Sequence, residues 1–306
     1  MQQYKFTQED IEFNAEGVIL RGWLYLPMGV NQAPIVVMAH GYNCIKELYL
    51  DKYAELFAQA GIAVLVYDNR NFGDSDGEPR QELDPWQQVR DYRNAITYAQ
   101  QLPKIDSNRI GIWGSSYSGG HVLVVGAIDK RVKCVVSQVP TISGYQTMLR
   151  RTRPDQWQAL RSKFDADRNT RYQNKPPTIV PMITIDNSNT VSHASSDASD
   201  FFTGKNAAET DQWRFSKWRN EITLRSIEMY SEYEPGSYIT RISPIPLLMI
   251  IGDNDVVSLT DLELETYNCA MEPKKLILIK GGHFAPYQEQ FAIAANAARD
   301  WFAQHL

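Results

Sequence analysis

Three serines, Ser115, Ser116 and Ser118, stand together at the end of an apolar run in RIGIWGSSYSGGHVL, residues 109–123. A serine at the end of a strand can act as a nucleophile when a sharp, strained turn into a helix exposes its hydroxyl. That turn requires small residues two positions before and two positions after the serine, because larger side chains would collide. The stretch therefore points to nucleophilic catalysis, and the flanking residues discriminate between the three serines.

The flanking residues favour Ser116. Ser115 has an aromatic residue two positions away on each side, which the turn would not accommodate. Ser116 has Gly114 before it and Ser118 after it, in a G-x-S-x-S variant of the G-x-S-x-G pattern. Ser118 is sterically allowed, but it would lie inside the helix that must follow. The alternative for the whole motif is an ordinary serine-rich helix cap.

A serine needs a base to take its proton, and His283 is the best-placed histidine. It lies in KGGHF, residues 280–284, directly after an apolar run at 276–279. Sites in α/β sheets are built from loops at the carboxyl ends of strands. The other histidines fit the end of the first parallel strand, the helix after Ser116, a polar segment and the C-terminus (His40, His121, His193 and His305, respectively). We interpret His40 as a residue that braces its loop.

The acid that orients the base should lie between the serine and the histidine in the chain. GDND, residues 252–255, meets this condition after the apolar run 246–251, and we favour Asp255 over Asp253. The first aspartate of such a turn more often caps its own loop by accepting hydrogen bonds from backbone N–H groups. Asp68 also ends a strand-like run, and we interpret it as a structural turn residue.

The negative charge that develops on the substrate carbonyl oxygen needs hydrogen-bond donors. One is expected from the backbone N–H of Tyr117, directly after Ser116 at the start of a helix. The second is expected from the backbone N–H of Tyr42 in HGYN, residues 40–43, where Gly41 lets the chain bend. The alternative for this second segment is a plain turn.

The elements that must position these residues follow a regular rhythm. Short aliphatic runs alternate with helix-length amphipathic stretches, as in parallel strands buried on both faces (35–39, 62–67, 110–113, 132–139, 246–251 and 276–279). An antiparallel pair at 11–13 and 18–26 precedes them. We therefore predict an α/β fold with a doubly wound, mostly parallel sheet and an antiparallel N-terminal lead-in.

The rhythm breaks at residues 141–243, which we interpret as a mostly helical cap or lid insertion between two strands. The α/β core then comprises 1–140 and 244–306. Within the insertion, 208–232 is predicted to be helical, and the almost wholly polar segment 187–200 is predicted to be a flexible loop. Insertions above a sheet edge often act as lids or substrate walls.

Two groups of insertion residues are candidates for substrate contact. Trp157, Trp213 and Trp218 could line a dry substrate site, or they could form the insertion's own small core. Residues 150–175 hold eight basic side chains against three aspartates. They could receive an anionic substrate, such as a carrier-protein or CoA thioester, although such a run is more often a solvated helix face.

Composition narrows the function classes. The formal net charge of −5 argues against a nucleic-acid partner. Three scattered cysteines and five scattered histidines offer no disulfide framework and no zinc spacing, so no metal is expected. The dinucleotide fingerprint is also missing, so no cofactor is implied. No apolar run approaches the length of a membrane span, and MQQYKFTQED lacks the pattern of a secretory signal, so we expect a cytoplasmic protein.

Taken in order, the motifs resemble landmarks of the α/β-hydrolase superfamily. They are HGY at 40–42, YDNRNFGDSDG at 67–77, GSSYSGG at 114–120, GDND at 252–255 and GGHF at 281–284. The serine motif is similar to that of the dienelactone-hydrolase-like and Xaa-Pro-dipeptidyl-peptidase-like branches. It departs from most relatives in having Ser118 in place of glycine, a small residue that should do no harm.

The insertion resembles the polyketide transferase family. The likeness rests on MLRRTRPD at 148–155, DADRNTR at 165–171 and the stretch 218–244. It implies an acyl group that is carried on Ser116 and handed to water or to an alcohol.

The sequence therefore predicts a serine hydrolase that cleaves an ester, thioester or lactone bond of a small-molecule acyl substrate. Ser116, Asp255 and His283 would be the catalytic residues, and an acyl-enzyme would form on Ser116. One alternative is an acyltransferase that moves an acyl or polyketide group to an alcohol with the same residues. The other is a catalytically silent binding protein on a hydrolase fold.

Overall fold

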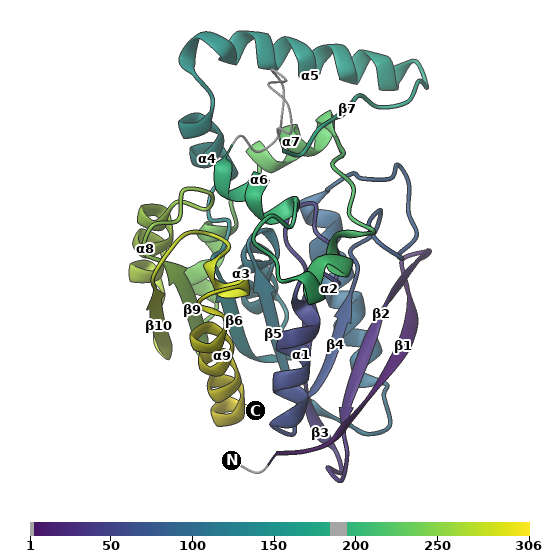
Figure 1. The fold of residues 1–306 in the computed structure, drawn as a ribbon, viewed down its shortest axis with the longest axis vertical. Coiled ribbons are helices and arrows are strands. Elements are labelled where there is room, and N and C mark those ends of the chain that lie inside the picture. The colour runs from purple at the N-terminus through teal and green to yellow at the C-terminus, as the bar shows by residue number, and fades with distance from the viewer. Residues whose placement is uncertain (1–2, 184–194) are drawn as a thin grey trace.

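The computed structural model describes residues 3–183 and 195–306 (Figure 1). Its centre is an eight-stranded sheet in the order β1-β2-β4-β3-β5-β6-β9-β10. The β1–β2 and β2–β4 pairs are antiparallel and the other pairs are parallel. The strands are β1 (Phe6–Ala15), β2 (Val18–Pro27), β3 (Ala33–Ala39), β4 (Ala63–Tyr67), β5 (Ile105–Ser115), β6 (Val132–Gln138), β9 (Leu247–Gly252) and β10 (Lys274–Ile279).

Helices cover both faces of the sheet, which explains the continuous apolar runs of the central strands. In β3, Ile35 and Val37 pack on the side of α2 (Pro85–Gln100) and α3 (Tyr117–Ile128). Val36 and Met38 pack on the other side, with α1 (Leu50–Gln59) and α9 (Phe291–His305). Strands buried on both faces lose the alternation of polar and apolar residues. The predicted doubly wound α/β fold class is confirmed.

Helix boundaries follow local signals. Asp84 caps α2 by accepting hydrogen bonds from the amides of Trp86 and Gln87, and Pro85 occupies the first helical position. The C-terminal helix α9 extends to His305, so this histidine is helical. The remaining core helix is α8 (Thr260–Cys269), between β9 and β10. In the described part of the chain, no helix is long and apolar enough to cross a membrane.

The segment between β6 and β9 forms the upper part of the molecule in Figure 1, with α5 outermost. Its elements are α4 (Gly144–Arg151), η1 (Pro154–Gln156), α5 (Trp157–Tyr172), β7 (Ile179–Val180), α6 (Ser196–Phe202), η2 (Glu209–Phe215), β8 (Ile222–Thr223), α7 (Leu224–Ser231) and η3 (Pro235–Arg241). We call residues 141–243 the cap, and its separation from the core as a domain stays a prediction.

Two expectations about the cap need correction. Residues 208–232 do not form one helix, because α7 begins only after Thr223, whose side chain accepts a hydrogen bond from the amide of Ser226. The polar segment 187–200 is not a loop throughout, because its last residues form part of α6. Its first part, including His193, lies outside the described residues.

Candidate active site

Ser116 occupies a strained turn between the end of β5 and the start of α3. Its φ of 59° and ψ of −119° lie in a region that non-glycine residues seldom adopt. Backbone hydrogen bonds stabilise this strained conformation. The Ser116 amide donates to the Gln138 carbonyl, and the Ser116 carbonyl accepts from the amides of Gly120 and Thr141. A Cβ at Gly114 would lie 2.2 Å from the Ser118 carbonyl oxygen, so this position requires glycine.

His283 follows β10, and only 2% of its surface is exposed. Its Nε2 lies 2.8 Å from Ser116 Oγ. Two glycines precede it, and Gly281 has a φ of 107°, which favours glycine. The Gly281 amide donates to Asp253 Oδ1 at 2.9 Å, so the loop that carries His283 is tied to the loop after β9.

Asp255 lies on the far side of the imidazole. Its Oδ2 lies 2.7 Å from His283 Nδ1, while its Oδ1 accepts hydrogen bonds from the amides of Val257 and Ser258. Burial would raise the pKa of Asp255, but the interaction with His283 and these two amides lower it below its ordinary value. The carboxylate therefore stays ionised and accepts the Nδ1–H, which leaves Nε2 free to accept the Ser116 proton.

The structure gives the two aspartates of GDND different contacts. Asp255 contacts His283, whereas Asp253 accepts from the Gly281 amide. Asp253 thus bonds a backbone N–H, as the sequence interpretation had it, but in the loop after β10 and not in its own loop.

The HGYN segment approaches Ser116 closely. A Cβ at Gly41 would lie 2.9 Å from Ser116 Cβ and 3.0 Å from the Ser115 carbonyl oxygen, so only glycine fits. The next residue, Tyr42, packs edge-on against Tyr117 with ring centroids 5.3 Å apart. The Tyr117 amide is the first of α3 and has no acceptor within the helix.

His40 and Asp68 take the supporting roles expected of them. Nε2 of His40 accepts a hydrogen bond from the Asn69 amide at 3.0 Å. Asp68 accepts hydrogen bonds from the amides of Lys46 and Asp74, and it forms an ion pair with Lys46 Nζ at 2.7 Å. The two residues brace the loops after β3 and β4.

A narrow pocket opens beside Ser116 and His283. We call it the acyl pocket. Its walls are apolar and largely aromatic (Gly41, Tyr42, Cys44, Leu48, Leu50, Met182, Phe201, Phe202, Val257, Phe284 and Tyr287). Phe201 stacks on Phe284 with ring centroids 4.3 Å apart, so α6 of the cap meets the loop that carries His283. A substrate placed against Ser116 would lie among hydrocarbon surfaces.

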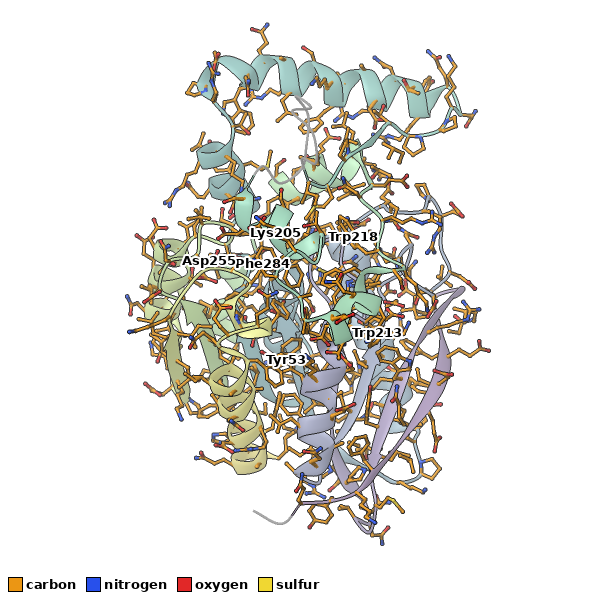
Figure 2. The ribbon with its side chains drawn as sticks, viewed as in Figure 1. Tyr53, Lys205, Trp213, Trp218, Asp255 and Phe284 are labelled. Atoms are coloured by element: carbon orange, nitrogen blue, oxygen red, sulfur yellow. The ribbon has the colours of Figure 1, made fainter. Side chains whose placement is uncertain are left out.

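The three predicted substrate tryptophans do not line this pocket. Trp213 is half exposed, and Figure 2 shows it well apart from Asp255. Trp218 stacks behind Phe202 with ring centroids 4.9 Å apart. Trp157 packs partly buried at the start of α5. The aromatic wall comes instead from Phe201 and Phe202.

Sequence reasoning missed most of this wall. Phe201 and Phe202 follow the polar segment that was interpreted as a loop, so no periodic pattern marked them. Phe284 and Tyr287 carried a weak signal, because they closely follow His283 and a residue next to a catalytic base often borders the substrate.

The basic residues at 150–175 do not line the acyl pocket. Several of them pair with carboxylates: Arg150 with Asp261, Arg153 with Asp155, Arg168 with Asp165, and Arg171 with Asp167. The pairs of Arg150 and Arg153 are exposed, which is typical of a solvated surface, whereas Asp167 is buried. Residues 3–183 and 195–306 contain no group of three or more histidine, cysteine or acidic side chains that could hold a metal ion.

Comparison with known proteins places the chain in a family. Residues 16–285 match the model for X-Pro dipeptidyl-peptidase (S15 family). The thiohydrolase aneE of Aspergillus aculeatus is 36% identical over 277 residues, which cover 88% of this chain and 84% of aneE. The quorum-quenching protein AidA of Acinetobacter baumannii is 34% identical over 249 residues, which cover 81% of this chain and 79% of AidA.

Solved structures of α/β-hydrolases match the fold of this chain. The crystal structure of the alpha/beta hydrolase GrgF from Penicillium has a TM-score of 0.84 and 27% identity, and the match covers 98% of this chain and 99% of GrgF. The curated Penicillium sequence called polyketide transferase grgF is 27% identical over 301 residues. Relatives thus include proteins named as hydrolases and as transferases, and both reaction types fit this chain. The chain belongs to the X-Pro dipeptidyl-peptidase (S15) family of α/β-hydrolases.

Proposed function

We propose that this protein is a serine hydrolase that cleaves an ester-like bond through an acyl-enzyme on Ser116. The observation that carries the proposal is the chain of two hydrogen bonds from Ser116 Oγ to His283 Nε2, and from His283 Nδ1 to Asp255 Oδ2, at 2.8 and 2.7 Å. A hydroxyl held in this way is activated by a neighbouring base whose tautomer is fixed by a carboxylate.

In the acylation step, Ser116 Oγ forms a bond to the substrate carbonyl carbon while its proton passes to His283 Nε2. The amides of Tyr42 and Tyr117 donate hydrogen bonds to the resulting oxyanion, each stabilising it by about 2.7–4 kcal/mol. When the tetrahedral intermediate collapses, the bond to the leaving group breaks and His283 returns the proton to that group. Water, activated by the same imidazole, then releases the acyl group as an acid.

The acyl pocket supports an apolar acyl group as the substrate's reacting part. Among the described residues its lining includes no aspartate, glutamate, lysine or arginine, and aromatic rings form one wall. The relative aneE bears the name thiohydrolase, which favours a thioester among the ester-like bonds. We therefore propose a small-molecule acyl thioester, with CoA or a carrier protein as the source of the thiol.

Replacing the nucleophile tests the proposal. Ser116→Ala should lower kcat on a p-nitrophenyl ester or an acyl thioester by about 10⁶-fold, as expected when the nucleophile of such a site is removed. Its circular dichroism spectrum and melting temperature should match those of the parent protein within a few degrees. A fluorophosphonate probe should label the parent and not the variant. Turnover by the variant at the parent rate would reject Ser116 as the nucleophile.

A transferase is the second candidate, because the site is dry. His283 is 2% exposed and aromatic side chains border Ser116, so a bound alcohol could outcompete water for the acyl-enzyme. Product analysis with and without added alcohol separates the two reactions. An ester product that rises with alcohol concentration, while free acid falls, would assign transfer. Free acid at an unchanged rate would assign hydrolysis.

The silent binding protein is the remaining alternative, and it makes a different prediction. A protein without catalysis would react with neither the ester substrates nor the fluorophosphonate probe. Labelling of the parent protein on Ser116, identified by mass spectrometry of the modified peptide, would eliminate it.

A further inference from the structure

A second cavity, of about 340 Å³, lies beside the HGYN segment. We call it the polar recess, and its lining comes from core loops and the cap (Asn43, Ile45, Gly73, Arg80, Gln81, Ser216, Lys217, Trp218 and Arg219). Alternate residues of one segment line the two cavities: Tyr42 and Cys44 line the acyl pocket, whereas Asn43 and Ile45 line the recess. The two cavities therefore flank the same loop.

The charged side chains that line the recess are all cationic. Three of its lining residues are cationic (Arg80, Lys217 and Arg219), and its lining includes no aspartate or glutamate from the described residues. Lys217 reaches past the lining to Glu47 and Asp74, which offset its charge. Arg80 and Arg219 also line the recess, and neither forms an ion pair within the described residues.

Arg80 is held in place by neutral acceptors. Its Nη1 and Nη2 donate to the carbonyls of Ser75 and Gly73 at 2.5 and 2.9 Å, and the described residues provide no acceptor for its other N–H donors. Burial lowers the pKa of Arg80, and the guanidinium of Arg219 lowers it further, while the carboxylates of Glu78, Asp68 and Asp76 oppose that shift. Two guanidinium groups therefore repel each other across the recess.

Arg219 is exposed, and no side-chain hydrogen bond or ion pair holds it within residues 3–183 and 195–306. Its carbonyl, by contrast, is fixed, because it accepts a hydrogen bond from Asn43 Nδ2 at 3.1 Å. The backbone thus holds the base of this side chain at the recess while the guanidinium keeps its donors. An oxyanion between Arg80 and Arg219 would remove the repulsion and accept bidentate hydrogen bonds.

One aromatic layer separates the recess from the acyl pocket. Trp218 lines the recess and stacks on Phe202, which lines the acyl pocket, with ring centroids 4.9 Å apart. Trp218 Nε1 also donates to the Asn43 carbonyl at 2.9 Å. An anion at the recess would therefore lie next to the loop that supplies the Tyr42 amide.

We propose that the polar recess binds a phosphate group. Several cationic side chains around one cavity suit a doubly charged anion, and the planar guanidinium matches the spacing of phosphate oxygens. Two sources share this chemistry. One is the phosphate of a substrate's pantetheine thiol arm, which rests on the thioester substrate proposed above, and the other is free inorganic phosphate.

Direct titration tests the site without any reliance on catalysis. Inorganic phosphate titrated calorimetrically into the Ser116→Ala protein, at constant ionic strength in chloride, should bind saturably. Arg219→Gln, made in the same background, should weaken this binding about tenfold, as expected for the loss of one charge-assisted contact. Arg219→Lys should recover part of the affinity. The matched control is Arg241→Gln, which removes an exposed guanidinium that does not line the recess and should leave phosphate binding unchanged.

Kinetics identify the source of the phosphate. For the parent protein, octanoyl-phosphopantetheine should have a higher kcat/KM than octanoyl-N-acetylcysteamine, which has the same thioester and no phosphate. Arg219→Gln should lower that ratio about tenfold if the substrate supplies the phosphate. If free phosphate is the ligand, added phosphate should instead change turnover of the N-acetylcysteamine thioester, and Arg219→Gln should abolish the effect.

The proposal is overturned if phosphate does not bind saturably, or if Arg219→Gln leaves its affinity and the substrate ratio unchanged. Failure of the proposed function is a separate outcome. In that case neither thioester is hydrolysed by the parent protein, while the calorimetric titration still reports on the recess.

Discussion

Two aspartates only two positions apart differ in what they touch. Asp255 accepts the Nδ1–H of His283 and two backbone amides, and its lowered pKa keeps it ionised. Asp253 accepts the Gly281 amide, so it acts on the backbone of the loop that carries the imidazole. The first residue sets the tautomer and charge of the base, and the second sets the position of the loop.

Asp255→Asn should lower kcat about 10⁴-fold, because the amide can stabilise the wrong tautomer of His283 and cannot stabilise the imidazolium. KM should change little, since Asp255 does not line the acyl pocket. Steady-state kinetics on a p-nitrophenyl ester measure both constants. A variant with more than a tenth of the parent kcat would contradict the role given to Asp255.

The matched variant is Asp253→Asn, which carries the same chemical change at the neighbouring site. Its side-chain oxygen can still accept from Gly281, so kcat should fall less than tenfold. Equal losses in the two variants would show that the loop, and not the carboxylate at residue 255, determines the rate.

At the scale of elements, the cap segment at η2 is fastened to the core by buried charge. Arg214 is 5% exposed, and its guanidinium pairs with Asp51 of α1 at 2.5 Å and with Asp211 at 2.9 Å. It also donates to the Glu47 carbonyl at 3.1 Å. These contacts hold residues 209–219, which include part of the polar recess, against the core.

Arg214→Gln should therefore loosen this segment more than it destabilises the whole protein. Removing one partner of a buried ion pair leaves the others uncompensated, at a cost of about 3 kcal/mol. We expect amide hydrogen exchange over η2 to speed up about 100-fold, with exchange in β5 unchanged. Lys205→Gln is the control, because its pair with Asp200 is exposed and contributes little. Equal exchange in the two variants would contradict the buried attachment.

The difference between local and long-range contacts explains which features the sequence could predict and which it could not. Gly114, Ser116 and Gly41 were identifiable because steric limits at a sharp turn act over a few residues. The strands were identifiable because burial on both faces leaves a continuous apolar run. Phe201 was not, because its place beside Ser116 depends on ring contacts with residues far away in the chain, such as Tyr49 and Phe284.

At the scale of the whole molecule, one buried histidine joins core and cap. His121 on α3 has Nδ1 2.9 Å from the Tyr233 hydroxyl of the cap and Nε2 2.9 Å from Gln88 Oε1 on α2. Nε2–H therefore donates to Gln88 Oε1, and in the neutral ring Nδ1 accepts from the Tyr233 hydroxyl. Burial, with a smaller contribution from the nearby His40, lowers the pKa of His121 to about 3.

This pKa makes the stability of the fold depend on pH with a definite sign. In the unfolded chain, His121 should titrate near pH 6.5, whereas in the folded protein it titrates near 3. Between these values the unfolded state binds the extra proton, so the free energy of unfolding falls as pH falls, by about 1.4 kcal/mol per pH unit at most. Above pH 6.5 this contribution is fully present.

His121→Gln removes the titrating group and should be less stable at pH 7.5 by about 1–3 kcal/mol, because buried hydrogen bonds are lost. Urea denaturation of both proteins from pH 7.5 to 4.5 should show this difference constant down to about pH 6.5 and falling below it. A difference that stays constant over that range would mean that His121 does not remain neutral in the folded protein.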